Sequence, residues 1–76
     1  MAGIVKFNIF RDDVFVFGGT KKYDELNKTI IDFLKLCNDD AEYEINGFDN
    51  QGDCVLDMFG SIDRICSILT KNQVRN

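Results

Sequence analysis

The spacing of apolar residues switches along the chain, and this switching constrains the fold more than any other feature of the sequence. Residues 4–11 alternate between two faces, and residues 14–17 are a run of β-branched and aromatic side chains, so both are expected to be strands. The Asp12-Asp13 pair between them predicts a tight hairpin turn. Residues 20–37 instead place apolar side chains three and four positions apart, which predicts a helix.

End signals define the limits of this first helix. Gly18-Gly19 is expected to end the second strand, and Thr20 is expected to be the N-cap of the helix. Tyr23 would open its apolar face. Asn38 can adopt the left-handed conformation that often ends a helix.

Two turn signals compete in the second half of the chain, after the alternating residues 42–45. Asn46-Gly47 is the strongest signal for a two-residue hairpin. The polar stretch 49–53 is favoured here, because it leaves Phe48 in a strand and makes Gly47 a bulge.

A strand over residues 54–59 and a second helix complete the pattern. Ser61 is expected to cap this helix, whose apolar face carries Ile62, Ile65, Cys66 and Leu69. The predicted fold is α+β with the order ββαββα, a four-stranded, mostly antiparallel sheet with two helices packed on one face. Residues 1–76 make a single domain, and residues 72–76 are expected to be a frayed tail.

Apolar side chains are expected on both faces of the sheet. Val5, Phe7 and Ile9 point toward the helices. The other face would expose Ile4, Phe10, Val55, Phe59 and one pair from the second strand, either Val14 with Val16 or Phe15 with Phe17. Two explanations remain open for such a patch: a partner or second copy covers it, or loops, the tail or a helix of the chain do.

Acidic residues are concentrated in one segment. Residues 39–63 contain no Lys or Arg, whereas residues 1–38 have a slight excess of basic residues, and the whole chain carries a net charge of −4. The acids of the segment are Asp39, Asp40, Glu42, Glu44, Asp49, Asp53, Asp57 and Asp63. This acidic segment is either a solvated surface that keeps the protein soluble or a binding surface for a basic partner.

Residues that catalysis and metal binding usually require are missing. The sequence has no His, so neither a Ser/His nor a Cys/His dyad can form. Cys37, Cys54 and Cys66 are widely spaced, form no CxxC motif and are expected on buried faces in a reducing compartment. We therefore predict no enzymatic activity, no metal site and no cofactor.

Nucleic acids and membranes are not predicted as direct partners. The net charge is negative, and no basic stripe interleaved with aromatic residues appears. No apolar stretch approaches the roughly 20 residues of a membrane span, and the first residues do not have the pattern of a signal peptide. These features lead us to expect a cytoplasmic protein.

The chain from Val5 to Leu69 resembles the Phox/Bem-type interaction domains of the ubiquitin-like superfold. The resemblance consists of an opening hairpin with Lys6 on its first strand, a helix, an aromatic-then-acidic turn over residues 48–53, and a short helix from Ser61. In that family the lysine of one domain pairs with the acidic segment of the next. The resemblance implies front-to-back association, although the family's acidic segment is denser in Asp and Glu.

A shorter resemblance involves residues 55–57 and 61–68, which are similar to the strand and the regulatory-serine helix of phosphocarrier proteins of the sugar phosphotransferase system. Those proteins carry a phosphorylated histidine, and this sequence has none. The resemblance therefore implies a related fold without phosphocarrier activity.

Taken together, these features predict a small, non-catalytic protein–protein interaction module that acts through the acidic segment and an exposed apolar sheet face. The partner would be another protein or a second copy, in a homodimer or a front-to-back oligomer. The alternative is a small phage- or plasmid-type inhibitor that binds a host enzyme or nucleic-acid-binding complex through its acidic surface. The candidate partner-binding residues are Lys6, Arg11, Asp49, Asp53, Asp57, Asp63, Phe10 and Phe59.

Overall fold

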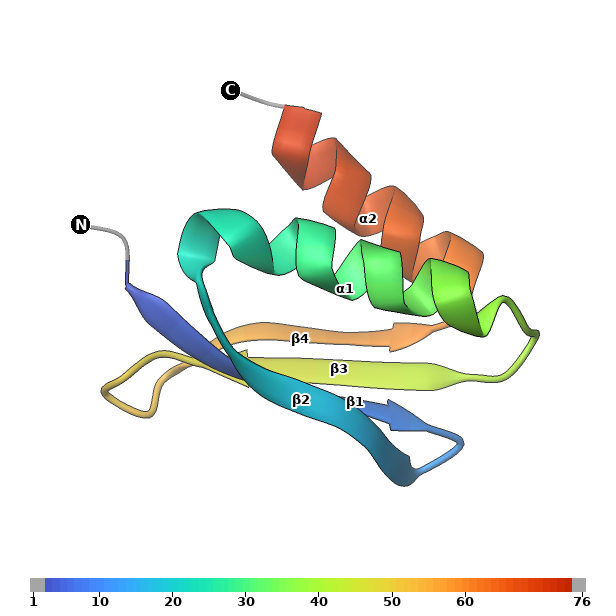
Figure 1. Ribbon diagram of the computed structural model, residues 1–76, viewed down its shortest axis with the longest axis horizontal. Coiled ribbons are helices and arrows are strands. Elements are labelled where there is room, and N and C mark those ends of the chain that lie inside the picture. The colour runs from blue at the N-terminus through green and yellow to red at the C-terminus, as the bar shows by residue number, and fades with distance from the viewer. Residues whose placement is uncertain (1–2, 75–76) are drawn as a thin grey trace.

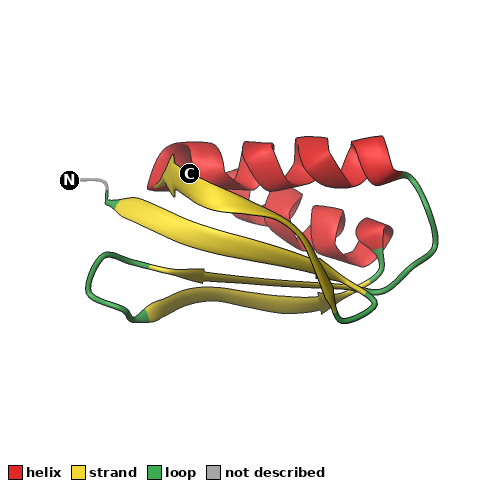
Figure 2. Cartoon of the chain, turned by 60° about the horizontal axis from the view of Figure 1, so that its bottom comes forward, coloured by secondary structure: helices red, strands yellow, loops and turns green. Residues whose placement is uncertain are grey.

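A computed structural model describes the backbone of residues 3–74 and the side chains of residues 3–71. Its elements are β1 (Ile4–Arg11), β2 (Val14–Lys22), α1 (Tyr23–Cys37), β3 (Tyr43–Phe48), β4 (Cys54–Gly60) and α2 (Ile62–Val74). The strands form one antiparallel sheet in the order β2-β1-β3-β4. Both helices lie on the same face of this sheet (Figures 1 and 2). The α+β fold and the ββαββα order predicted from the sequence are confirmed.

The hydrophobic core lies between the sheet and the two helices. Val5, Phe7 and Ile9 of β1 are fully buried, as their alternation predicted. The other buried residues come from α1, the segment before β3, β3 itself and α2: Leu26, Ile30, Leu34, Ala41, Tyr43, Ile45, Ile65 and Leu69. β1 and β3 supply the sheet's share of the core because they are the two inner strands.

A bulge in β4 explains two differences from the sequence expectations. Residues 49–53 form the turn, as predicted, but the extra residue is Val55, between Cys54, which pairs with Phe48, and Leu56, which pairs with Gly47. A bulge interrupts the alternation of side chains between the two faces. Val55 therefore packs against the core instead of facing out, and Cys54 is exposed instead of buried.

The second strand does not end at Gly18-Gly19. β2 continues to Lys22, and α1 begins at Tyr23, which is exposed. A Cβ at Gly18 would come within 2.6 Å of the Phe7 carbonyl oxygen, so this glycine permits a close approach of two strands and does not mark a turn. Thr20 consequently lies in the strand, and its prediction as the N-cap was wrong.

The end of α1 and the start of α2 are those the sequence predicted. Asn38 is left-handed with φ of 46°, and its N–H donates to the Leu34 carbonyl oxygen at 3.0 Å. The Ser61 hydroxyl accepts the Arg64 N–H at 3.2 Å and caps α2. Residues 72–74 belong to α2, while their side chains and all of residues 75–76 lie outside the described part, so the expected frayed tail stays a prediction. Within the described residues, neither helix has the length and apolar run needed to cross a bilayer.

Candidate interaction surface

The most exposed strand of the sheet is β2. It lies at one edge, and every residue in it except Gly18 is exposed. Its first four residues, Val14, Phe15, Val16 and Phe17, are all exposed and apolar, and we call them the apolar edge. An edge strand also leaves a row of backbone N–H and C=O groups unpaired. The apolar edge therefore offers both hydrophobic side chains and hydrogen-bonding groups to a partner.

The sequence left open which pair of β2 side chains faces outward, and the structure exposes both pairs. Val16 is the extra residue of a bulge, between Phe15, opposite Phe10, and Phe17, opposite Ile9. Phe15 lies on the sheet face away from the helices. Its ring contacts the Phe10 ring edge-on, with the ring centroids 5.8 Å apart. Phe17 lies on the helix side, yet it stays exposed because no strand lies beyond β2.

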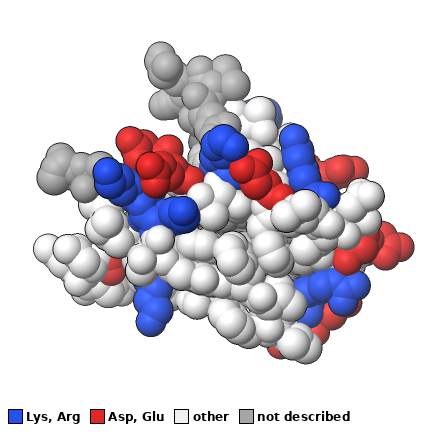
Figure 3. Space-filling model, viewed as in Figure 1, with Lys and Arg blue, Asp and Glu red and all other residues white. Residues whose placement is uncertain are grey.

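A shallow groove continues the apolar edge onto α1. The Phe17 ring stacks on Phe33 of α1 with the ring centroids 4.6 Å apart. A hollow of about 370 Å³ beside this pair is lined by Phe17, Thr29, Asp32, Phe33 and Leu36. Figure 3 shows a broad band over β2 and α1 in which side chains without charge predominate. We call this hollow the α1 groove.

Leu36 of the α1 groove is a residue that the sequence reasoning missed. Its side chain is 84% exposed, the largest exposure among the large hydrophobic residues of the described part. A signal was available: the buried stripe of α1 is Leu26, Ile30 and Leu34, and a residue two positions after Leu34 falls on the opposite side of the helix. A leucine on a solvent face of a helix is a marker of a binding surface when other apolar residues adjoin it.

The sheet face away from the helices, which we call the outer face, is less apolar than expected. Phe10 and Phe59 lie in one row across the strands with Phe15 and Glu44, in the order Phe15, Phe10, Glu44, Phe59. Glu44 therefore separates Phe59, which is 56% exposed, from the other two rings. The apolar surface expected on the outer face is concentrated at the β2 side instead.

The next row of the outer face is polar. Asn8, Asn46 and Asp57 are consecutive across β1, β3 and β4, and the Asn8 side-chain amide donates to the Asn46 side-chain oxygen at 3.1 Å. Lys6 lies in the row beyond, between Thr20 of β2 and Phe48 of β3, and is exposed. Lys6 and Asp57, two candidate residues, thus share one face of the same molecule.

Arg11 is held within the molecule by the acidic segment itself. Its Nε donates to Asp39 Oδ2 at 2.9 Å, which forms an ion pair. The Tyr43 hydroxyl and the Ala41 N–H donate to Asp39 Oδ1 at 2.9 and 3.2 Å. Arg11 and Asp39 therefore fix the loop between α1 and β3 to the end of β1, and a partner would have to compete for either side chain.

These contacts shift the protonation of the groups involved. Partial desolvation acts to raise the pKa of Asp39, but the hydrogen bonds from Arg11, Tyr43 and Ala41 outweigh it and leave this pKa below its usual value. The hydrogen bond to Asp39 raises the pKa of Arg11. Desolvation and the hydrogen bond to Asp39 raise the pKa of Tyr43. Asp39 is thus charged across the physiological range and serves as an internal anchor.

The other acidic candidates do not form one patch. Asp49 is engaged in its own turn, because its Oδ1 accepts the Gln51 N–H and the Asp53 N–H, both at 2.9 Å. Asp53 is exposed in the same turn, Asp57 lies on the outer face, and Asp63 lies in the first turn of α2 on the helix side. The acidic segment therefore supplies separate charges on both sides of the sheet.

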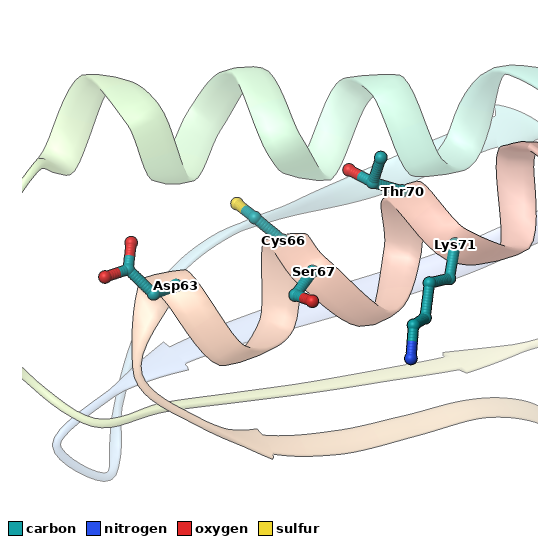
Figure 4. A pocket seen from close by; sticks show the side chains of 5 residues that line it. All are labelled: Asp63, Cys66, Ser67, Thr70 and Lys71. Atoms are coloured by element: carbon teal, nitrogen blue, oxygen red, sulfur yellow. The ribbon is translucent and has the colours of Figure 1, made fainter.

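A second hollow, of about 470 Å³, lies along one face of α2 and is lined by Asp63, Cys66, Ser67, Thr70 and Lys71. Figure 4 shows the Cys66 side chain directed toward α1 and the Lys71 side chain directed away from it. Burial raises the pKa of the Cys66 thiol, so the thiol is less readily converted to the nucleophilic thiolate. Cys66 is therefore a less reactive thiol than a fully exposed cysteine.

No three Cys, Asp or Glu side chains among the described residues are grouped so that they could hold a metal ion.

Comparison with known proteins adds no assignment: no family model, no curated protein and no solved structure matches this chain. The resemblances to Phox/Bem-type domains and to phosphocarrier proteins remain predictions from sequence. The geometry of the surface itself is therefore the basis for a functional proposal.

Proposed function

We propose that this chain is a small, non-catalytic protein-interaction module that binds its partner through the apolar edge of β2. The observation that carries the proposal is the exposure of four consecutive apolar residues, Val14–Phe17, on an edge strand. Exposed strands of this kind are bound by β-augmentation, in which a partner strand adds to the sheet through main-chain hydrogen bonds. The partner would present an extended segment with apolar side chains.

Two neighbouring features support the choice of this surface. The α1 groove adjoins the apolar edge through the stacked pair Phe17 and Phe33, so a bound segment can place a side chain beside Leu36. Charged side chains border this region and do not interrupt Val14–Phe17. Polar rims around an apolar centre are the usual organisation of protein interfaces.

The exposed acids would select among partners. Asp53, Asp57 and Asp63 are free of the internal hydrogen bonds that hold Asp39, among the contacts of the described residues. Separate exposed charges act mainly on encounter rate and on rejection of like-charged partners, and contribute little to affinity. The acidic segment is thus proposed as an auxiliary element and the apolar edge as the binding site.

Site-specific photo-crosslinking tests this function in cells that express the chain naturally. Phe15→benzoylphenylalanine places the crosslinker on the apolar edge, and Phe59→benzoylphenylalanine places it on the opposite edge strand. The two phenylalanines are matched in exposure, at 55% and 56%. Discrete adducts from position 15 that are absent from position 59 are expected. Adducts from neither position would overturn the proposal, and adducts from position 59 alone would move the binding site to β4.

A further inference from the structure

We propose that the occupant of the apolar edge is a second copy of this chain, whose β2 pairs antiparallel with the first about a two-fold axis near Phe17. This inference rests on the proposed function and names its partner. The dimer would join two four-stranded sheets into one sheet of eight strands. Such an isologous contact uses the same surface on both copies and closes after two subunits.

The first support is the absence of charge and proline from most of β2. Native edge strands are blocked by charged side chains, by proline, by β-bulges or by being very short. Both edge strands of this sheet carry one bulge, at Val16 of β2 and at Val55 of β4, so bulges do not distinguish them. β2 has nine residues, and residues 14–20 include neither a charged residue nor a proline. The other edge strand, β4, carries the exposed Asp57 near its middle. β2 is therefore the less protected of the two edges.

The second support is the opposite charge at the two ends of β2. Asp12 and Asp13 form the turn before it, and Lys21 and Lys22 are its last two residues. None of these four side chains belongs to an ion pair within the described residues. An antiparallel second copy brings the lysine end of each strand beside the aspartate turn of the other, twice by symmetry. A parallel copy would bring like charges together, which is unfavourable.

The third support is the distribution of side-chain size along the strand. Val14–Val16, before Phe17, are large and apolar, whereas the three residues after it, Gly18–Thr20, are small. With the axis near Phe17, the large half of each strand lies beside the small half of the other. The small residues Gly18–Thr20 of each strand leave space that the partner's Val and Phe side chains can fill. Interface packing requires complementarity of this kind.

The helix layer extends the same contact. A two-fold axis perpendicular to the sheet keeps all four helices of the dimer on one face. Because α1 is the helix that packs beside β2, the two α1 helices then lie on either side of this axis. The α1 groove of each copy faces the other. The proposed dimer would thus reduce the exposure of Leu36 and Phe33 as well as that of the apolar edge.

Light scattering after size exclusion tests the proposal on the full chain across a concentration series. The wild type is expected to have twice the monomer mass of 8.7 kDa. Phe15→Lys places two like charges in the interface and should raise the dissociation constant by more than about tenfold. Phe59→Lys, the matched control on β4, should leave the mass doubled. Circular dichroism confirms that both variants are folded.

Other outcomes would overturn the second copy as the occupant. These outcomes are a monomeric wild type at every concentration, a mass that rises beyond the dimer through head-to-tail pairing of β2 with β4, or a dimer that only Phe59→Lys disrupts. The crosslinking experiment separates the two proposals. Adducts from position 15 at a mass other than twice that of the chain, with a monomeric wild type, would retain the interaction function and exclude the self-pairing.

Discussion

The two edges of the sheet have the same secondary structure and opposite surroundings. In β4, Leu56 and Met58 alternate with exposed residues and pack against the core, and α2 lies over the strand. In β2 almost every residue is exposed, although its first four residues are all apolar and β4 has no such uninterrupted run. Apolar composition alone therefore does not determine burial in this protein. Position in the sheet and coverage by a helix determine it.

The two edges also differ in protection from further pairing. β4 presents the exposed carboxylate of Asp57, whereas Val14–Phe17 of β2 carry no charge. A charge on an edge strand opposes pairing with another chain, because pairing would desolvate it. The difference supports β2 as the edge that binds and β4 as the edge that is kept free.

The largest expected effect compares the same substitution in covered and uncovered regions. Leu69→Ala removes a fully buried side chain of α2 and should lower the free energy of unfolding by about 2–5 kcal/mol. Leu36→Ala, in the exposed α1 groove, should change it by no more than about 0.5 kcal/mol in the monomer. Urea denaturation at low protein concentration measures both. Equal losses would mean that Leu36 is packed as closely as Leu69.

A smaller effect is expected from removing the charge that protects β4. Asp57→Val should allow this edge to pair as well, so that the apparent mass in light scattering increases with concentration beyond that of the wild type. Asp63→Val is the control, because it removes the same charge from the start of α2 and leaves the sheet edge unchanged. A mass for Asp57→Val identical to the wild type would show that Asp57 does not protect the edge.

The smallest effect concerns the loop before β3, which is anchored by Asp39. The pKa of Asp39 is lower in the folded protein than its unfolded value of about 3.9, so its bonds stabilise the fold above about pH 4. This contribution is lost as the pH falls through the folded-state pKa. Asp39→Asn should therefore melt at a lower temperature than the wild type at pH 7, with the difference shrinking below pH 4.

Thermal melts followed by circular dichroism between pH 2 and pH 7 check this prediction. Asp53→Asn, in the exposed turn between β3 and β4, separates the loss of one negative charge from the loss of the Asp39 bonds. A difference between Asp39→Asn and the wild type that stays constant across the pH range would contradict the role of the Asp39 carboxylate.

Interpretation of the sequence succeeded where a few neighbouring residues carry the information. The alternation of Val5, Phe7 and Ile9 predicted their burial, and Asn38 and Ser61 ended and capped the helices as expected. It failed at Gly18-Gly19 and Thr20, because a glycine that permits close strand approach has the same sequence signature as a turn glycine. Cys54 was placed on the wrong face because Val55 forms a bulge.

The candidate site could be predicted only in part. Phe10 and Phe59 do lie on the outer face, but Glu44 separates them, and Arg11 is held by Asp39. The strand order was the missing information, because it places Glu44 between two phenylalanines that are 49 positions apart in sequence. Leu36 is a surface residue that helical spacing alone could have identified.

The sequence by itself determined the elements, their order and the inward face of β1, because hydrophobic period and capping depend on residues within a few positions of one another. Only the tertiary structure decided that β2 lies at an edge, that α2 covers β4, and that Arg11 meets Asp39. These contacts join residues far apart in the chain, and they depend on how the whole sheet pairs and which face the helices cover. The apolar edge exists because four residues with a core-like sequence lie where the helix layer ends.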